Sequence, residues 1–225
     1  MTDDGLFPET IETERLRLER LDRSTSVLEQ YDYVNVEAPN VDEITEYMTW
    51  SPHETPNETR EFLEGVTEGW ENGERAEYAV LPREGEPRAG EYAGSAGIGI
   101  DWDRRTATLG MWLRKPFWGR GYSGERAAAL MHLAFDRLDL EMVAVTHQVG
   151  NEKSRRAIEK YVDRFGGRRE GRFRNFEPHL DGGAVDSVRY TVSREEWTTN
   201  RPNDLDVVFV EQLAEDDRDR QSGGP

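Results

Sequence analysis

A glycine-rich stretch at residues 115–124, with the sequence KPFWGRGYSG, contains the residue types that point most directly to a ligand. Gly119, Gly121 and Gly124 have the spacing G-x-G-x-x-G, and glycine lets the backbone approach a phosphate closely. Backbone amides at a helix N-terminus attract anions, so this turn ahead of a helix predicts a phosphate-binding site. The apolar stripe of that helix is Ala127, Leu130, Met131, Ala134, Phe135 and Leu138.

The same glycine spacing fits the fingerprint of a dinucleotide-binding oxidoreductase. That fold needs an apolar parallel strand directly before the turn and an acidic residue about 20 residues further on. Here residues 115–118 separate the turn from the preceding strand, and the next strand ends in Thr146-His147-Gln148 without an acid. An enzyme using a nicotinamide or flavin cofactor is therefore the weaker interpretation of the turn.

Charge is unevenly distributed along the 225 residues, which carry a formal net charge of −17. Residues 104–174 contain 16 basic and 8 acidic side chains, so a cationic segment lies within an acidic chain. Residues 164–176 interleave arginine with phenylalanine, as RNA-binding segments do. A strongly negative protein repels a polyphosphate backbone at long range, so we expect a small anionic ligand and no nucleic acid partner.

Arginine supplies most of the positive charge, because Lys115, Lys153 and Lys160 are the three lysines among 29 basic residues. Acidic residues are dispersed along nearly the whole chain. Molar salt screens charges over about 3 Å and removes the self-repulsion of such a surface. The composition predicts a halophilic protein, with an ordinary acidic protein as the alternative.

The residue types that the chain lacks exclude several kinds of site. Without cysteine there is no disulfide, thiolate nucleophile or cysteine-ligated zinc, and the four histidines are scattered, so we expect no metal site. No apolar run approaches the ~18 residues of a membrane helix, and the N-terminus lacks the features of a signal peptide. We expect a cytoplasmic protein with no membrane partner, either a monomer or a homodimer.

Hydrophobic periodicity predicts a mixture of strands and helices. The expected strands are residues 13–21, 76–81, 92–102, 106–113, 142–145, 169–176 and 185–192. The expected helices are residues 41–48, 56–70, 123–138 and 151–161. Thr55-Pro56-Asn57-Glu58 resembles a capping box at the start of the second helix, and Asn72-Gly73 ends it.

The chain divides by composition into one domain with two extensions. We expect an acidic N-terminal extension at residues 1–10, a single domain at residues 11–197, and a C-terminal extension, partly disordered, at residues 198–225. The apolar patch VVFV at residues 207–210 predicts a strand or helix that docks on the domain or on a partner.

Residues 110–122, with the sequence GMWLRKPFWGRGY, closely resemble the acetyl-CoA motif of the GNAT N-acetyltransferases. The resemblance is strongest to the branch of the ribosomal-protein alanine N-acetyltransferases. Residues 151–160 (NEKSRRAIEK) resemble the N-x-x-S-R-R helix of that branch, and residues 165–171 resemble the strand entry after it. With further matches near the N-terminus, the likeness covers roughly residues 10–197, which makes it far more specific than a glycine triplet.

The resemblance implies an α+β fold of the GNAT type, a three-layer arrangement with helices flanking a mixed, mostly antiparallel central sheet of about seven strands. In such a fold strands four and five splay apart, and the pantetheine arm of acetyl-CoA pairs with the exposed edge of strand four. The diphosphate rests on amides of the glycine turn. The binding residues implied by the resemblance are Met111, Trp112, Leu113, Gly119, Arg120, Gly121, Tyr122, Ser123, Gly124, Asn151 and Ser154. A helix N-cap is the alternative role for Asn151.

The chain departs from the family pattern at several positions. The motif usually begins with Gln or Arg and has Gly or Ala at its sixth place, where this chain has Trp118 and Ser123. Many relatives use a tyrosine on the second helix to protonate the leaving thiolate, and the matching residue here is Ile158. Tyr161 lies one turn later. Residues 162–164 are three extra residues expected between this helix and the next strand.

Acetyl transfer to an amine, the reaction that the resemblance implies, needs a neutral amine, a stabilised oxyanion and a thiol leaving group. His147 is the best single candidate for the base, with a histidine of purely structural role as the alternative. Ser154 is expected to bind acetyl-CoA or to protonate the thiolate, and Tyr161 is a second candidate acid. An amide near Leu113 would hold the oxyanion. A terminal amine has a pKa of ~7.7–8.0, so water is also a sufficient base.

The acceptor amine is the least constrained part of the prediction. The branch suggests a peptide N-terminus, and similar sequences accept small amines. Acidic residues between positions 25 and 75 would suit a cationic acceptor, or they belong to a halophilic surface. Since no clear acid or base matches the family, a catalytically silent acyl-CoA-binding protein is the alternative function.

Overall fold

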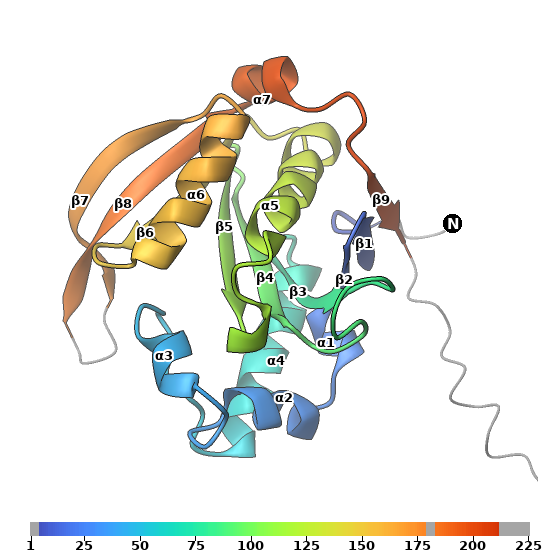
Figure 1. Ribbon diagram of the computed structural model, residues 1–225, viewed down its shortest axis with the longest axis vertical. Helices are drawn as coiled ribbons and strands as arrows, with labels where there is room; N and C mark the ends of the chain where they lie inside the picture. Colours follow the sequence, from blue (N-terminus) through green and yellow to red (C-terminus); the bar gives the residue numbers. More distant parts are fainter. Residues whose placement is uncertain (1–4, 179–182, 212–225) are drawn as a thin grey trace, which may run out of the picture.

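The computed structural model describes residues 5–178 and 183–211. Over these residues, nine strands form one mixed sheet in the order β7-β8-β6-β5-β4-β3-β2-β1-β9 (Figure 1). The strands are β1 (Thr10–Thr13), β2 (Leu16–Arg20), β3 (Arg75–Pro82), β4 (Gly94–Asp101), β5 (Thr106–Leu113), β6 (Met142–Gln148), β7 (Arg168–Pro178), β8 (Ala184–Ser193) and β9 (Val207–Val210).

The expected number of about seven strands is too low, although the fold class is as expected. The segment predicted as one strand from residue 13 contributes to a hairpin instead, because β1 pairs with β2 from Thr10 opposite Glu19. The second additional strand is β9, which pairs antiparallel with β1. The apolar patch at residues 207–210 is therefore an edge strand of the same sheet.

Antiparallel pairing dominates the sheet, and β5 with β6 is the parallel pair. The meander β3-β4-β5 forms as predicted. The β5–β6 pairing runs from Thr106 opposite Met142 to Leu109 opposite Val145 and then stops, although β5 continues to Leu113. The sheet therefore opens between these two strands, as the family resemblance implied.

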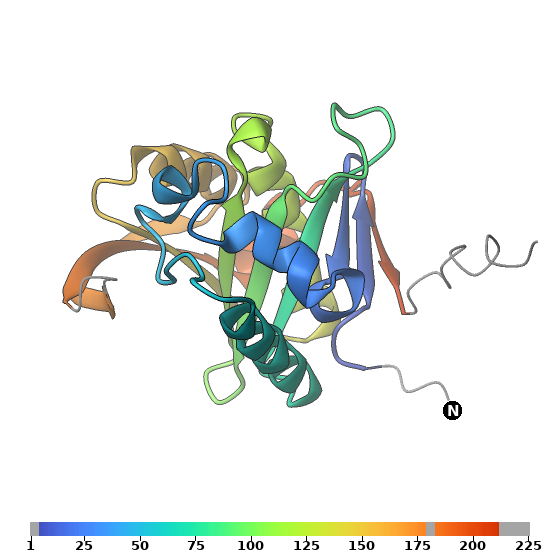
Figure 2. The ribbon, with the colours of Figure 1, turned by 90° about the horizontal axis from the view of Figure 1, so that it is seen from below.

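Helices cover both faces of the sheet (Figure 2). They are α1 (Leu21–Ser24), α2 (Val27–Val34), α3 (Val41–Thr45), α4 (Pro56–Glu71), the 3₁₀ turn η1 (Lys115–Phe117), α5 (Tyr122–His132), the π-helical segment η2 (Leu133–Arg137), α6 (Glu152–Arg164) and α7 (Arg194–Asn200). The predicted apolar stripe from Ala127 to Leu138 belongs to α5, η2 and the residue that follows, and it is buried in the larger core. A smaller core on the other face joins α1 and α4 to β3.

The expected capping box at residues 55–58 and the expected connection at residues 162–164 are both absent. Thr55 is the N-cap of α4, but its side chain accepts no helix amide. Its hydroxyl instead donates to Glu58 at 3.2 Å. Glu58 instead accepts the amide of Glu54 at 3.0 Å, one residue before the cap, so the reciprocal capping box does not form. Residues 162–164 are not a connection, because they form the last turn of α6, where Val162 is buried.

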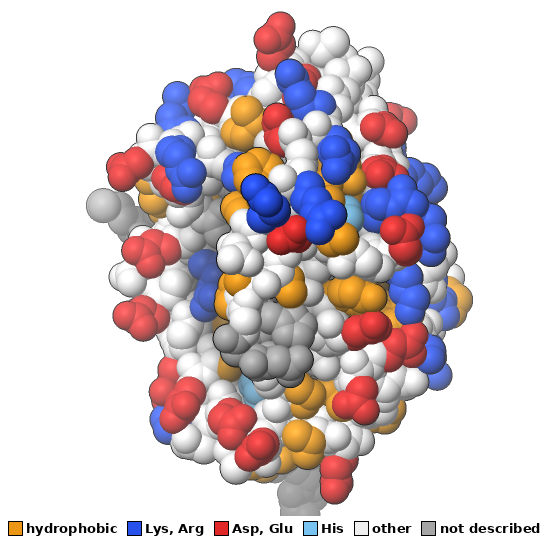
Figure 3. Space-filling view, turned by 90° about the vertical axis from the view of Figure 1, so that its left-hand side faces the viewer, with side chains coloured by type: hydrophobic (Ala, Val, Ile, Leu, Met, Phe, Trp, Pro, Cys, Tyr) orange, Lys and Arg blue, Asp and Glu red, His pale blue; other side chains and the backbone are white. Residues whose placement is uncertain are grey.

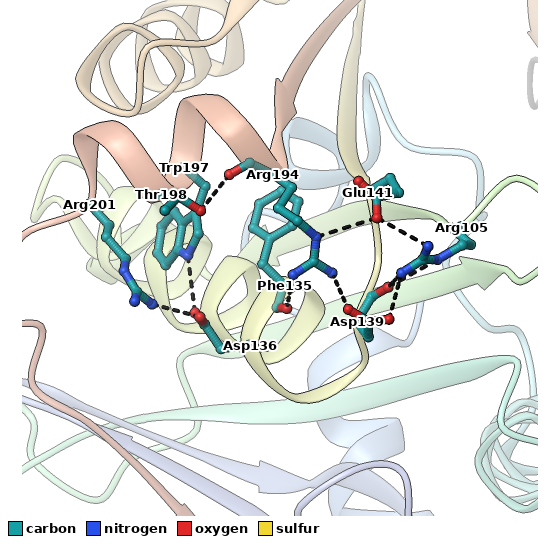
Figure 4. A network of polar contacts seen from close by, with 9 residues as sticks. All are labelled: Arg105, Phe135, Asp136, Asp139, Glu141, Arg194, Trp197, Thr198 and Arg201. Atoms are coloured by element: carbon teal, nitrogen blue, oxygen red, sulfur yellow. Dashed lines mark hydrogen bonds and ion pairs between the residues drawn. The ribbon is translucent and has the colours of Figure 1, made fainter.

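A polar network holds α7 against η2 (Figure 4). Asp136 accepts the indole N–H of Trp197 at 3.0 Å and an Arg201 N–H at 2.6 Å. Arg194 donates to the carbonyl oxygen of Phe135 at 2.9 Å. Together with β9, these contacts attach part of the segment after residue 197 to the domain. The proposed extensions also include residues 1–4 and 212–225, which lie outside the described residues.

Within the described residues, no helix combines the length and apolar character needed to cross a bilayer. The same residues contain no cluster of three or more histidine, aspartate or glutamate side chains placed to hold a metal ion.

Candidate functional site

A cavity of about 1280 Å³ lies between α5, α6 and the open edge of β5. It brings together every site residue that the sequence analysis named. From β5 and the turn these are Met111, Trp112, Leu113, Gly119, Arg120, Gly121, Tyr122, Ser123 and Gly124, and from β6 and α6 they are His147, Asn151, Ser154 and Tyr161. Of the three lysines, Lys153 and Lys160 of α6 also line the cavity, and Lys115 belongs to η1.

The glycine turn has the backbone shape that its composition predicts. Gly119 has φ of +74° and Gly121 has φ of +82°, values that residues with a Cβ adopt at a cost. Gly121 is the N-cap of α5, so the amides of Tyr122 and Ser123 have no partner within the helix. A Cβ added at Gly119 would meet no atom within 4 Å, which leaves the turn open toward the cavity.

Contacts from three other elements fix the turn in place. Glu125, in the first turn of α5, accepts the Arg15 Nε–H at 2.7 Å and the Thr13 hydroxyl at 2.6 Å. Arg15 Nη1 also donates to the carbonyl oxygen of Arg120 at 3.0 Å. The indole N–H of Trp118 donates to the Leu113 carbonyl oxygen at 2.7 Å, which joins the turn to the end of β5. The turn is thus held before any ligand arrives.

An ion bridge connects α3 to the turn and to α6. Glu43 accepts from Lys115 at 2.6 Å and from Lys153 at 2.7 Å, and both lysines hold the pKa of Glu43 below its ordinary value. The Lys153 ammonium also lies 4.2 Å from the centroid of the Trp118 ring. Since Glu43 and Lys153 line the cavity, α3 borders the same space as α6.

The two candidate polar residues at the start of α6 contact each other. The Asn151 side chain accepts the backbone N–H of Ser154 at 3.0 Å, so Asn151 is the N-cap of the helix. This geometry gives Asn151 its structural role and leaves its amide nitrogen for a ligand. Ser154 is half-buried on the cavity wall.

His147 lies on the cavity wall and is 6% exposed. Its Nδ1 lies 2.9 Å from the carbonyl oxygen of Gln148, so this nitrogen carries the proton of that hydrogen bond. Nε2 lies 3.4 Å from the hydroxyl of Tyr190, which also contacts Glu159 at 3.2 Å. The ring therefore has protein partners at both nitrogens, and the contact at Nε2 is the weaker one.

Three buried polar side chains on the cavity wall have unpartnered atoms, and one of them is Gln148 through its Nε2. The Tyr161 hydroxyl has no hydrogen-bond partner, and burial raises the pKa of Tyr161 to about 12. Arg126 on α5 is 2% exposed, and its Nε and Nη1 have no partner either. The sequence analysis did not single out Arg126. Its signal was a charged residue directly before the mostly apolar stretch from Ala127 to Phe135.

The opposite face of the sheet carries a second group that sequence reasoning missed. Glu77 of β3 pairs with Gly97 of β4, which in turn pairs with Gly110 at the open end of β5. A Cβ at Gly97 would collide with the Glu77 carboxylate, so the glycine makes room for it. Burial raises the pKa of Glu77 to about 7. The pattern that signalled this site was a glutamate between the buried residues Ala76 and Tyr78.

Aromatic rings lie on the same face, beside the open end of β5. The Trp112 ring lies 5.5 Å from Trp50 and 5.9 Å from Tyr92, and the Tyr92 ring stacks on Tyr33 at 4.7 Å between centroids. Trp112 also lines the cavity. Together with Glu77, these rings form a surface that suits an amine, because carboxylates and aromatic faces attract cations.

The sequence profile of the Acetyltransferase (GNAT) domain matches residues 15–161, which is well over half of the chain. The chain belongs to the GNAT acetyltransferase family. The match includes β5, the glycine turn and most of α6, so the cavity lies mainly within the matched region. Membership of this family makes the protein an acyltransferase.

Individual relatives agree with this assignment. The chain is 31% identical over 147 residues to a Bacillus subtilis (strain 168) protein named as a ribosomal N-acetyltransferase, YdaF, covering 64% of this chain and 75% of the relative. A crystal structure from T. thermophilus, described as an acetyltransferase, has a TM-score of 0.67 at 30% identity and covers 87% of this chain and 94% of that one. Mycobacterium smegmatis RimJ in complex with CoA-disulfide has a TM-score of 0.69 at 17% identity, over 85% and 90% of the two chains, and supports the fold.

Proposed function

We propose that the protein transfers an acetyl group from acetyl-CoA directly to a primary amine. The observation that carries the proposal is the unpaired edge of β5 beyond Leu109, which shares one cavity with the glycine turn. An extended amide chain needs such an edge, and a diphosphate needs such a turn. Acetyl-CoA contains both, at the two ends of its pantetheine arm.

The residues of the cavity fit acetyl-CoA. Met111, Trp112 and Leu113 offer backbone groups of β5 that β6 does not pair. The turn from Gly119 to Gly124 offers amides and an open approach for the diphosphate. Arg126 and Tyr161 line the same cavity, and their unpartnered atoms need polar ligand atoms. Asn151 and Ser154 would contact the ligand from α6.

The chemistry requires one bond exchange. The amine nitrogen attacks the thioester carbonyl carbon, the C–S bond breaks, and the amine loses one proton while the sulfur gains one. A backbone amide near Leu113 would stabilise the oxyanion. His147 from the cavity wall and Glu77 from the opposite face are the two candidates for taking up the proton of the amine. Ser154 and Tyr161 are the candidates for supplying a proton to the sulfur.

The acceptor class follows from the names of the relatives and from charge. YdaF is named as a ribosomal N-acetyltransferase, and this likeness favours a peptide N-terminus as the acceptor. Glu46 lines the cavity, and a carboxylate at that position would attract a cationic acceptor. A catalytically silent acyl-CoA-binding protein is the second candidate, favoured by the residue Ile158 at the position where many relatives have a tyrosine acid.

An acceptor screen tests the proposal. Purified protein is mixed with acetyl-CoA and with peptides of varied N-terminal residue or with polyamines, and the release of free CoA thiol is measured. We expect release above the hydrolysis background for at least one amine, together with acetylation of that amine by mass spectrometry. Binding of acetyl-CoA without release of thiol for any amine would favour the silent protein.

A further inference from the structure

Arg126 is a buried cation with two guanidinium nitrogens that lack a hydrogen-bond partner among the described residues, and the carboxylate whose charge acts on it, Glu77, lies on β3 across the sheet. It lies one turn after Tyr122 on α5 and is 2% exposed, and neither its Nε nor its Nη1 has a hydrogen-bond partner. Burial is the main cause that lowers the pKa of Arg126 from its ordinary value. Removing a guanidinium from water without a hydrogen-bond acceptor for two of its nitrogens is unfavourable, so the position calls for an acceptor that enters the cavity.

Tyr161 faces the same part of the cavity from α6. It is 2% exposed and its hydroxyl also has no partner. The two side chains are close enough for the charge of Arg126 to affect the pKa of Tyr161. The guanidinium of Arg126 on α5 and the hydroxyl of Tyr161 on α6 are therefore two hydrogen-bond donors on the wall of one cavity. Arg126 Nε, Arg126 Nη1 and the Tyr161 hydroxyl have no acceptor among the described residues.

The surroundings of this pair favour a small anion of low hydration. The cavity that Arg126 and Tyr161 line also has apolar wall residues, among them Leu109, Met111, Ala128, Val145 and Ile158. Leu109 and Val145 form the last pair between β5 and β6, so this is where the sheet divides. A diphosphate is strongly hydrated and can bind at the exposed glycine turn. A sulfur atom is soft and weakly hydrated, so it is the part of the ligand that better suits a buried site.

We propose that Arg126 and Tyr161 receive the sulfur of CoA as it leaves, with Arg126 stabilising the thiolate and Tyr161 donating a hydrogen bond to it. The inference rests on the proposed acetyl transfer. When the amine attacks, the C–S bond breaks and its electron pair stays on the sulfur. The thiolate then takes up the proton that the acetylated amine releases, so the products are an amide and the CoA thiol.

The ionisation of bound CoA tests this assignment without any turnover. A free thiol has a pKa of ~8.5, and a buried guanidinium beside it should lower that value in the complex. We expect the affinity of the wild-type protein for CoA to rise with pH from about pH 6 to pH 8, and thiolate absorbance to appear at lower pH than for free CoA. Arg126→Met should lose this rise, with roughly tenfold weaker CoA binding at the upper pH, one unit of thiol pKa being a factor of ten.

Desulfo-CoA, which lacks the thiol, is the ligand control. Other titratable groups face this region, namely Tyr161 on α6, His147 on β6 and Glu77 on β3 across the sheet. Any pH dependence that they cause will appear with desulfo-CoA too and can be subtracted. If Arg126→Met weakens CoA and desulfo-CoA equally, Arg126 acts on another part of the ligand and the inference is wrong.

Matched variants control for charge and folding. Arg155→Met removes the same charge from α6, where Arg155 pairs with Glu152 at 2.7 Å, and should leave the thiolate signature unchanged. Arg126→Lys keeps the charge and should retain part of the thiolate signature. If Arg126→Met does not fold, Tyr161→Phe replaces it as the test. Loss of the thiolate signature in folded Tyr161→Phe supports the inference, and full retention of the signature overturns it. Wild-type protein that binds acetyl-CoA but shows no thiolate signature overturns this inference alone. Wild-type protein that binds neither ligand overturns the proposed function and this inference with it.

Discussion

Leu109 of β5 and Val145 of β6 form the last residue pair of the parallel junction, and beyond them the two strands diverge. Four residues of β5 follow Leu109 before the strand ends, and all of them line the cavity. The same divergence separates Arg126 and Tyr161 on one face of the sheet from Glu77 and Trp112 on the other. One break in pairing thus leaves the last four residues of β5 unpaired with β6 along the wall of the ligand cavity.

Asn151 is expected to contribute to both folding and binding. Asn151→Ala removes the acceptor for the Ser154 amide and should lower the free energy of unfolding by about 1 kcal/mol, measured by urea denaturation. It should also weaken acetyl-CoA binding several-fold. Ser26→Ala is the matched control, because Ser26 caps α2 by accepting the Glu29 amide at 3.3 Å. If both variants lose stability and neither loses affinity, Asn151 is a cap alone.

Glu77 is expected to make stability depend on pH. Burial raises its pKa to about 7 in the folded state, above the unfolded value of ~4.3, so the folded state holds the extra proton between these limits. The contribution of Glu77 is therefore favourable below about pH 4 and is lost as pH rises through 7. Glu77→Gln should be more stable than wild type by about 3–4 kcal/mol at pH 8 and nearly equal to it at pH 4, by thermal unfolding. An equal difference at both pH values would contradict the burial of this carboxylate.

The same substitution separates the two candidate bases. If Glu77 accepts the proton of the amine, kcat/KM of the wild type should rise with pH through about 7, and Glu77→Gln should abolish that rise and lose a factor of about 10² or more. His147→Gln is the comparison. A Glu77→Gln variant with full activity and an unchanged pH profile would remove Glu77 from the mechanism.

Asp136 is expected to stabilise the junction between η2 and α7. Although burial alone would raise its pKa, hydrogen bonds from His132 and Trp197 outweigh burial and hold the pKa of Asp136 below its ordinary value. The contribution of Asp136 to the free energy of unfolding is therefore present above about pH 4. It is lost as the pH falls through the lowered pKa that Asp136 has in the folded state. Asp136→Asn should cost about 1 kcal/mol at pH 7 in chemical denaturation, and the loss should shrink in acid. Asp139→Asn, at a more exposed position of the same network, should cost less (Figure 4).

The charge distribution predicts salt-dependent stability. With a formal net charge of −17, the folded chain repels itself at low ionic strength, and molar KCl should raise the unfolding temperature by removing that repulsion. Figure 3 shows Lys and Arg side chains interspersed with Asp and Glu side chains on one face of the molecule. An unfolding temperature that is the same in dilute buffer and in molar KCl would favour an ordinary acidic protein.

Local pattern and family resemblance together predicted most of the cavity. The turn at Gly119 and Gly121 was visible because glycine spacing and a following apolar stripe are local signals. The hairpin of β1 and β2 was not, because the turn at Glu14 and Arg15 contains neither glycine nor proline. A single alternating strand was the simpler interpretation of that segment.

The sequence alone did not predict Glu77 and Arg126 as candidate site residues, because their environment depends on pairing and packing between distant segments. Glu77 is unusual because its register partner is Gly97 on the neighbouring strand, and no local pattern records that pair. Arg126 looked like one more surface arginine, since its burial depends on how α5 packs against α6. Both residues became candidates when the register and the packing were known.

Titration of acetyl-CoA into the protein by calorimetry in molar KCl tests the central claim most directly. The account predicts saturable binding that Gly121→Asp abolishes, because an aspartate at φ of +82° would strain the turn and place a carboxylate beside the diphosphate. NADH should not bind. Absence of acetyl-CoA binding by the folded wild-type protein would contradict the account, and binding of NADH in its place would revive the dinucleotide interpretation.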